Sequence, residues 1–211
     1  MKFSARLLSR AAAACALLGP AAAAAPARDL GRGLAYYRVH ELPADLPAPP
    51  GARPGPCVVD LRFARAGEAG ASALRAWVRA GATARTPVFL LENEATSAAL
   101  RAALPGNGPA GLIVLAPASE GLAADITVRV TADADRGAYD LLEKGASLES
   151  LLADNPDKPR VDEEYLEKEH LSDADAPDVA TGGASPPQPP VDAMLQRAVQ
   201  LHRGLLALKR L

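Results

Sequence analysis

A short apolar run at residues 87–91 leads through a polar turn into the small-residue segment 96–104, and this pattern constrains the fold more than any other. Continuous apolar runs of this length are typical of parallel strands that are covered on both faces. Further strand patterns are found at residues 33–42, 57–63, 112–115 and 126–130, and the last alternates as a strand near an edge does. Because helical patterns separate several of these runs, the sequence predicts an α/β fold with a mostly parallel sheet and flanking helices.

Three helical segments are expected beside these strands. Residues 68–80 have an apolar face at helical spacing. Residues 135–144 are amphipathic, with Asp133 as the expected N-terminal cap and Gly145 as the residue that ends the helix. Ser147 is then expected to cap one further helical turn.

The C-terminal region is predicted to contain an acidic helix, a linker and a final amphipathic helix. Residues 161–171 are rich in glutamate and predict an exposed helix, whereas residues 172–190 are rich in proline and glycine. Asp192 is expected to cap the last helix. One stripe of that helix is apolar, so it must be buried in the same domain or in self-association. The stripe consists of Met194, Leu195, Ala198, Val199, His202, Leu205 and Leu206.

Residues 1–27 have the organisation of a secretory signal. Basic residues precede an apolar run that is too short to span a bilayer, and small residues then permit cleavage after Ala24 or Ala27. Cys15 lies inside the apolar run rather than after it, which disfavours a lipoprotein. Retention as an N-terminal anchor is the alternative. The sequence thus predicts a periplasmic or secreted protein with no further membrane-spanning segment.

Removal of the signal makes the chain more acidic. Residues 1–24 hold three of the 23 Lys and Arg residues, which leaves 20 against 25 Asp and Glu, a net charge of −5. This balance argues against a nucleic-acid partner. Cys57 would then be the single cysteine, and its apolar neighbours predict a small buried core residue. The expected regions are the signal (1–27), an α/β core (28–155), the acidic helix with the linker (156–190) and the final helix (191–211).

Three consecutive pieces of the chain resemble the tail-specific (C-terminal-processing) serine proteases. The strand Val58-Val59-Asp60-Leu61-Arg62, the strand at 88–91 and the turn Asn93-Glu94-Ala95-Thr96-Ser97-Ala98-Ala99 follow the order of that family's core. The segment Asp192-Ala193-Met194-Leu195-Gln196-Arg197-Ala198-Val199 is similar to one that often ends family members. The resemblance covers roughly residues 57–131 and 191–201. It implies a ClpP/crotonase-like fold and a serine-type peptidase family, with the nucleophile in the turn.

The chain departs from this family where catalysis needs specific groups. Alignment on Asn93 and Thr96 puts the nucleophile position on Ala98, whereas Ser97 lies one residue earlier and points about 100° away on a helix. The resemblance also implies a catalytic lysine after the next strand, but residues 98–143 contain no lysine. Since a serine without a base is a weak nucleophile, the chain resembles a degenerate, catalytically inactive member.

The candidate site residues are Asn93, Thr96, Ser97, Asp60 and Arg62. Ser97 is the candidate nucleophile with Thr96 beside it, although capping of the following helix is the alternative role for both. Amides at that helix start could also bind an anion such as a peptide C-terminus. Asp60 and Arg62 are two residues apart on a strand and point to one face, so they either form a structural ion pair or line the mouth of the site.

Other reactive side chains show no ligand pattern. His40, His170 and His202 lack the spacing of metal ligands, and the acidic run beside His170 favours a solvated helix face. Residues 133–137 faintly resemble a calcium loop, but Lys144 stands where the closing glutamate should be. Phosphate-loop and zinc motifs are not found in the sequence. We therefore predict no metal and no cofactor.

Two classes of function follow from these patterns. The first is a non-catalytic binding or assembly role, with a peptide or protein partner in the cell envelope, and one version of it is a domain whose only task is to partner another envelope protein. The alternative is a serine-type peptidase or hydrolase that uses Ser97 with a base such as His40, His202 or Lys144. Self-association in the first class would use Met194, Leu195, Ala198, Val199, Leu205 and Leu206.

Overall fold

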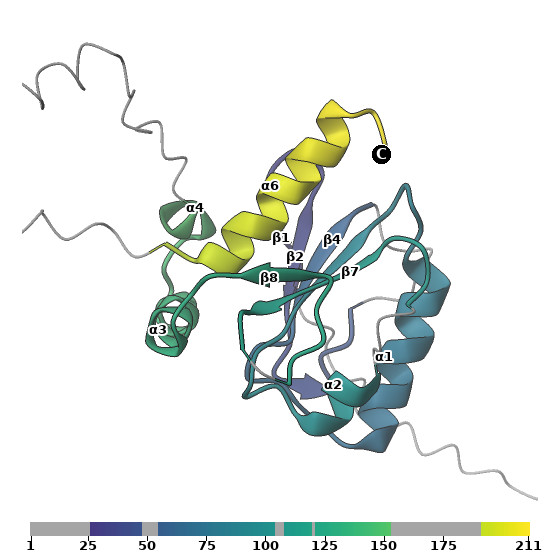
Figure 1. Ribbon diagram of the computed structural model, residues 1–211, viewed down its shortest axis with the longest axis vertical. Helices are drawn as coiled ribbons and strands as arrows, with labels where there is room; N and C mark the ends of the chain where they lie inside the picture. The colour runs from purple at the N-terminus through teal and green to yellow at the C-terminus, as the bar shows by residue number, and fades with distance from the viewer. Residues whose placement is uncertain (1–25, 48–54, 104–107, 120, 153–190) are drawn as a thin grey trace, which may run out of the picture.

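The computed structural model of the chain forms an α/β fold with a mostly parallel sheet and flanking helices, as the sequence predicts (Figure 1). It describes residues 26–47, 55–103, 108–119, 121–152 and 191–211. The expected signal segment, apart from residues 26 and 27, lies outside these ranges, as do the acidic helix and the linker. Among the described residues, no helix has the length and apolar character needed to cross a membrane.

The main sheet has six strands in the order β1-β2-β4-β6-β7-β8. They are β1 (Arg28–Asp29), β2 (Ala35–Arg38), β4 (Cys57–Asp60), β6 (Val88–Leu91), β7 (Leu112–Pro117) and β8 (Ile126–Val128). β1 is antiparallel to β2, and every later pair of neighbours is parallel. The parallel strands β2, β4, β6, β7 and β8 therefore all have their carboxyl ends at the same edge of the sheet. β8 is the outermost strand, as expected.

The N-terminal strand region is more divided than the sequence predicts. Residues 33–42, expected as one strand, form β2 and β3 (Glu41–Leu42), which belong to different sheets. β3 pairs in parallel with β5 (Arg65–Ala66). At the break, the backbone amide of His40 bonds to the Asp45 side chain instead of continuing the ladder. Alternation of apolar and polar residues carries no sign of such a side-chain contact, so it could not reveal the break.

Helices cover both faces of the main sheet. One face carries α1 (Glu68–Gly81) and α2 (Ala98–Ala103), and the other carries α3 (Ala132–Glu143), α4 (Leu148–Leu151) and α6 (Ala193–Ala207). Figure 1 shows the sheet between α1 and α6. The Ser147 hydroxyl caps α4 and Gly145 follows α3 with a φ of 91°, both as predicted.

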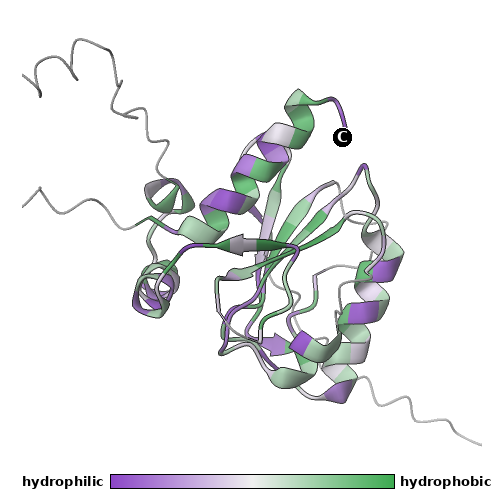
Figure 2. Ribbon diagram, viewed as in Figure 1, coloured by the Kyte–Doolittle hydropathy of each residue, from purple (hydrophilic) through white to green (hydrophobic). Residues whose placement is uncertain are grey.

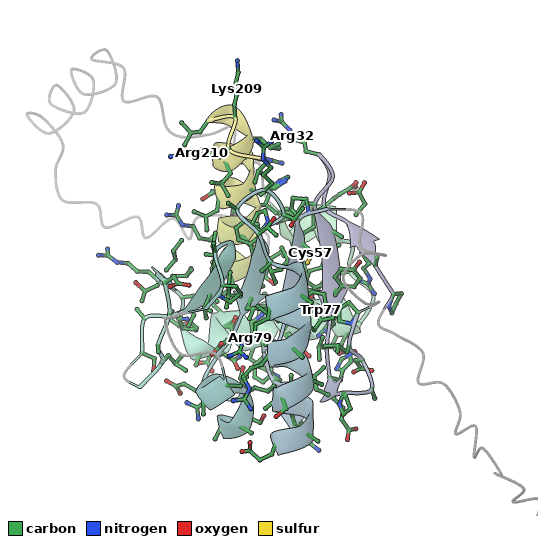
Figure 3. All side chains as sticks on the ribbon, turned by 90° about the vertical axis from the view of Figure 1, so that its right-hand side faces the viewer. Arg32, Cys57, Trp77, Arg79, Lys209 and Arg210 are labelled. Carbon is green, nitrogen blue, oxygen red and sulfur yellow. The ribbon has the colours of Figure 1, made fainter. Side chains whose placement is uncertain are left out.

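Alternating side chains of the strands build two separate cores. In β6, Val88 and Leu90 face α1, whereas Phe89 and Leu91 face α6. Figure 2 shows the strands as the most continuously hydrophobic part of the chain, between helices of mixed character. Cys57 is fully buried in the α1 layer, as predicted, and is labelled in Figure 3 above Trp77 of that helix. Complete burial of a side chain such as Phe89 contributes about 1.5–3 kcal/mol.

The final helix packs onto its own domain, which is one of the two possibilities that its apolar stripe left open. Met194, Leu195 and Ala198 have no exposed surface and Val199 is 4% exposed, and all four belong to the core between α6 and the sheet. The proposed self-association stripe also includes Leu205 and Leu206, and both of these are half-buried. Most of the stripe is therefore already packed against the sheet, and it cannot serve as a self-association surface without undocking the helix.

The N-terminus of α3 corrects one expectation. The helix begins at Ala132, and the Thr131 hydroxyl accepts a hydrogen bond from the amide of Ala134 at 3.2 Å. Asp133, the expected cap, lies inside the first turn. Both residue types suit helix starts, so composition could not choose between them. The earlier start is important because it places Asp135 in the first turn of the helix, pointing into the protein, where it is 3% exposed.

Candidate active and binding site

The carboxyl ends of the parallel strands form the part of the molecule where the sequence-predicted site residues meet. Asp60 ends β4 and Arg62 follows it, while Asn93 and Thr96 lie in the loop after β6. In open α/β sheets, ligands bind at this edge, where loops rather than backbone ladders present the side chains. The sequence-predicted residues therefore lie together at this edge, but the contacts they make differ from those expected.

Arg62 is the centre of a buried ion network. Its guanidinium has no exposed surface and contacts three carboxylates. Nε and Nη2 donate to the two oxygens of Asp60 at 3.0 and 2.7 Å. Nη1 and Nη2 donate to Asp192 at 3.1 and 2.8 Å, and Nη1 also donates to Asp135 at 2.8 Å. All five N–H groups of the guanidinium are thereby used, so Asp60 and Arg62 form the structural ion pair and do not line an open mouth.

The buried ion network shifts the pKa values of Arg62 and Tyr36. Burial alone would lower the pKa of Arg62, but the carboxylates of Asp60 and Asp192 outweigh it and raise that pKa well above its usual value. The Tyr36 hydroxyl donates to Asp60 at 2.8 Å, and burial together with the Asp60 charge raises the tyrosine pKa well above 10. Arg62 and Tyr36 consequently keep their protons at neutral pH, so neither serves as a base there.

Asp192 connects this network to the C-terminal helix. Its Oδ1 accepts the amide of Leu195 at 2.9 Å, which makes Asp192 the N-cap of α6 as predicted. The same carboxylate binds Arg62, 130 residues earlier in the sequence. One side chain therefore both starts the last helix and fastens it to the end of β4.

The loop after β6 is held rigid by Asn93 and Thr96. The Asn93 side-chain oxygen accepts the amides of Phe63, Ala95 and Thr96 at 3.1–3.3 Å. Its Nδ2 donates to Asp135 at 2.9 Å, which joins the loop to the Arg62 network. The Thr96 hydroxyl accepts the amide of Asn93 and donates to the carbonyl of Leu61, both at 3.0 Å. Both residues, predicted as binding groups, hold the loop against the end of β4.

Ser97 is placed unfavourably for nucleophilic attack. Its amide donates to the carbonyl of Ala64 at 3.1 Å, and its hydroxyl is buried with no hydrogen-bond partner in the part of the chain that the structure describes. The hydroxyl does not cap α2, the alternative role that the sequence suggests for it. The amides of Thr96 and Ser97 bond to the carbonyls of Asn93 and Ala64, so these two amides are not available to an anion.

The structure brings none of the three candidate bases to Ser97. His40 lies 3.5 Å from Glu143, in a separate pocket of about 280 Å³ that Arg38 also lines. His202 is buried in α6, where burial and the neighbouring Arg203 and Arg32 lower its pKa. Lys144 follows the end of α3. None of them hydrogen-bonds to Ser97 among the described residues.

A pocket of about 310 Å³ opens beside the Asn93 loop. Residues 93–95, residues 117–119, Ala132 and Asp135 line it together with Phe63 and Val130. Its walls combine apolar groups with the carboxylates of Glu94 and Asp135, and the Ser119 hydroxyl contacts Glu94. Neither Thr96 nor Ser97 is among the described residues that line it. The open cavity is therefore separate from the buried serine.

Glu92 is a buried titratable group that the sequence did not single out. It directly follows β6, is 3% exposed, and its amide continues the sheet by donating to Leu115 at 2.9 Å. Burial raises its pKa to about 7, although the nearby Arg101 guanidinium acts in the opposite direction. The signal was available in the sequence, because alternation along β6 places residue 92 on the same buried face as Val88 and Leu90.

No protein-family model matches this chain, and the searches of curated proteins and of solved structures found no match either.

Proposed function

We propose that this chain is an exported, non-catalytic relative of the tail-specific serine proteases that binds a peptide or protein partner in the pocket beside the Asn93 loop. In this proposal the α/β fold is of the ClpP/crotonase-like type and the protein acts in the periplasm or outside the cell. The observation that carries the proposal is that, within the described ranges, no base bonds to the Ser97 hydroxyl, whereas a pocket beside the same loop is open.

The contact between two motifs supports the family relationship. The Asp60-Leu61-Arg62 strand end and the segment that begins at Asp192 were identified independently as family-like pieces of sequence. In the structure they meet through the paired hydrogen bonds of Arg62 with Asp192, at 3.1 and 2.8 Å. This contact joins the two pieces of sequence that resemble the family, and it is the structural observation that supports the proposed relationship.

The position of the pocket supports a binding role. It lies at the carboxyl edge of the parallel sheet, which is the usual ligand edge of such folds. Its loop is held by the Asn93 and Thr96 hydrogen bonds, so the cavity is formed before a ligand arrives. A preformed cavity with few ionic groups suits recognition better than it suits hydrolysis.

A peptide selection tests the proposed function. The purified chain would be immobilised, exposed to a random decapeptide library, and the retained peptides identified by mass spectrometry. We expect an enriched set that is lost when Ala118→Trp fills the pocket rim and is kept in Ala76→Trp, which adds the same bulk to an exposed site of α1. A set retained equally by all three proteins, or no enriched set, would contradict binding at this pocket.

A further inference from the structure

The pocket beside the Asn93 loop has a one-sided charge. The ionisable residues among its described lining are Glu94 and Asp135, and no lysine or arginine joins them. Glu94 is exposed at the rim, whereas Asp135 is 3% exposed at the inner wall. An anionic ligand would be repelled here, and a cationic one attracted.

Two cations that contact pocket-lining residues, Arg62 on Asp135 and Arg136 on Phe63, are already engaged. Arg62 gives all its donors to the buried aspartates, so a single guanidinium serves three carboxylates. Arg136 pairs with Asp140 at 2.9 Å and its guanidinium lies 4.6 Å from the centre of the Phe63 ring. Neither cation lines the pocket. Arg62 pairs with Asp135 from the protein side of the wall, but because one guanidinium faces three carboxylates the buried cluster keeps a net negative formal charge.

The remaining walls suit the aliphatic part of a long side chain. Phe63, Pro117 and Val130 supply apolar surface, with small alanine side chains between them. Lysine and arginine bury their methylene stems on such surface while their charged heads reach polar groups. The cavity, at about 310 Å³, is at the lower end of the usual range for ligand pockets and fits a group of side-chain size.

We propose that this pocket takes a basic side chain, lysine or arginine, of a bound peptide. The stem lies against Phe63 and Val130, and the charged head lies at the Glu94 carboxylate on the rim, because both Asp135 oxygens are bonded to Arg62 and Asn93. This inference rests on the proposed peptide-binding function and specifies its ligand. It also disfavours a peptide C-terminal carboxylate in the pocket, because the ionisable wall groups are acidic and the amides of Asn93, Ala95 and Thr96 are bonded within the protein.

Four matched peptides test the inference. Fluorescein-labelled heptapeptides of alanine and glycine with lysine, arginine, norleucine or glutamate at the centre would be titrated with the purified chain, and binding followed by anisotropy. We expect the lysine and arginine peptides to bind at least about tenfold more tightly than the norleucine peptide, with the glutamate peptide weakest. Raising the salt from 0.05 to 0.5 M, about a threefold shorter Debye length, should reduce this preference.

Two variants locate the effect. Glu94→Gln should weaken the lysine peptide about fivefold and leave the norleucine peptide unchanged. Glu149→Gln removes the same charge from an exposed site of α4 that does not line the pocket, and should change neither. Equal binding of all four peptides in a manner blocked by Ala118→Trp would overturn the basic-ligand inference while the proposed function stands. Absence of binding by any of them, together with an empty library selection, would overturn the proposed function itself.

Discussion

Replacing Arg62 with leucine is expected to lower the free energy of unfolding by about 3–5 kcal/mol, the usual cost of removing one partner from a buried ion network. The change leaves Asp60, Asp135 and Asp192 buried without the guanidinium that pairs with their carboxylates. It also releases the start of α6 from the end of β4. Urea unfolding followed by circular dichroism would measure the loss, with an unchanged denaturant slope as evidence that the folded state is retained.

Two further variants show whether geometry or charge is responsible. Arg62→Lys keeps the positive charge but cannot supply the planar five-donor fork, so it should recover less than half of the loss. Arg79→Leu removes a guanidinium from an exposed site of α1, labelled in Figure 3, and should cost less than about 0.5 kcal/mol. A loss below about 1 kcal/mol in Arg62→Leu would mean that the network is not what holds the carboxyl edge together.

Glu92→Gln is expected to stabilise the protein at alkaline pH and to leave it nearly unchanged at pH 4. Because burial raises the pKa of Glu92 from 4.5 to about 7, the folded state holds a proton that the unfolded state releases between these values. The contribution of the protonated carboxyl to stability is therefore present below pH 4.5 and is lost as the pH rises through 7. At about 1.4 kcal/mol per pKa unit, the full difference is roughly 3 kcal/mol.

The measurement is the difference in unfolding free energy between wild type and Glu92→Gln at intervals from pH 4 to pH 8.5. Taking a difference removes the contributions of His202 and of other titrating groups that both proteins share. Glu149→Gln is the matched control, since its side chain is exposed and its curve should run parallel to that of the wild type. A Glu92→Gln difference that stays constant over this pH range would show that residue 92 titrates as an ordinary surface glutamate.

The sequence predicted the fold class because the deciding signals are local. The continuous apolar run of β6 and its polar turn predict a covered parallel strand, and the structure has Val88–Leu91 buried at all four positions. The same local logic predicts the caps at Ser147 and Asp192, where a side chain bonds to an amide three residues later. These features need no knowledge of the rest of the chain.

The site chemistry could not be predicted because it depends on contacts between distant residues. Asp135 is 73 residues from Arg62 and Asp192 is 130 residues from it, and no pattern along the sequence joins them. Each aspartate has a sufficient local explanation, as a helix residue or as a cap. The docking of α6 was likewise one of two possibilities for an apolar stripe, and only its position on the sheet decides between them.

The central claim, that the protein binds without hydrolysing, is tested most directly by labelling the purified chain with a fluorophosphonate serine-hydrolase probe. An active tail-specific protease would be labelled in parallel as the positive control. Because the Ser97 hydroxyl is buried and has no base among the described residues, we expect no labelling of the folded chain. Stoichiometric labelling that disappears in Ser97→Ala would contradict the claim and would identify Ser97 as an activated nucleophile.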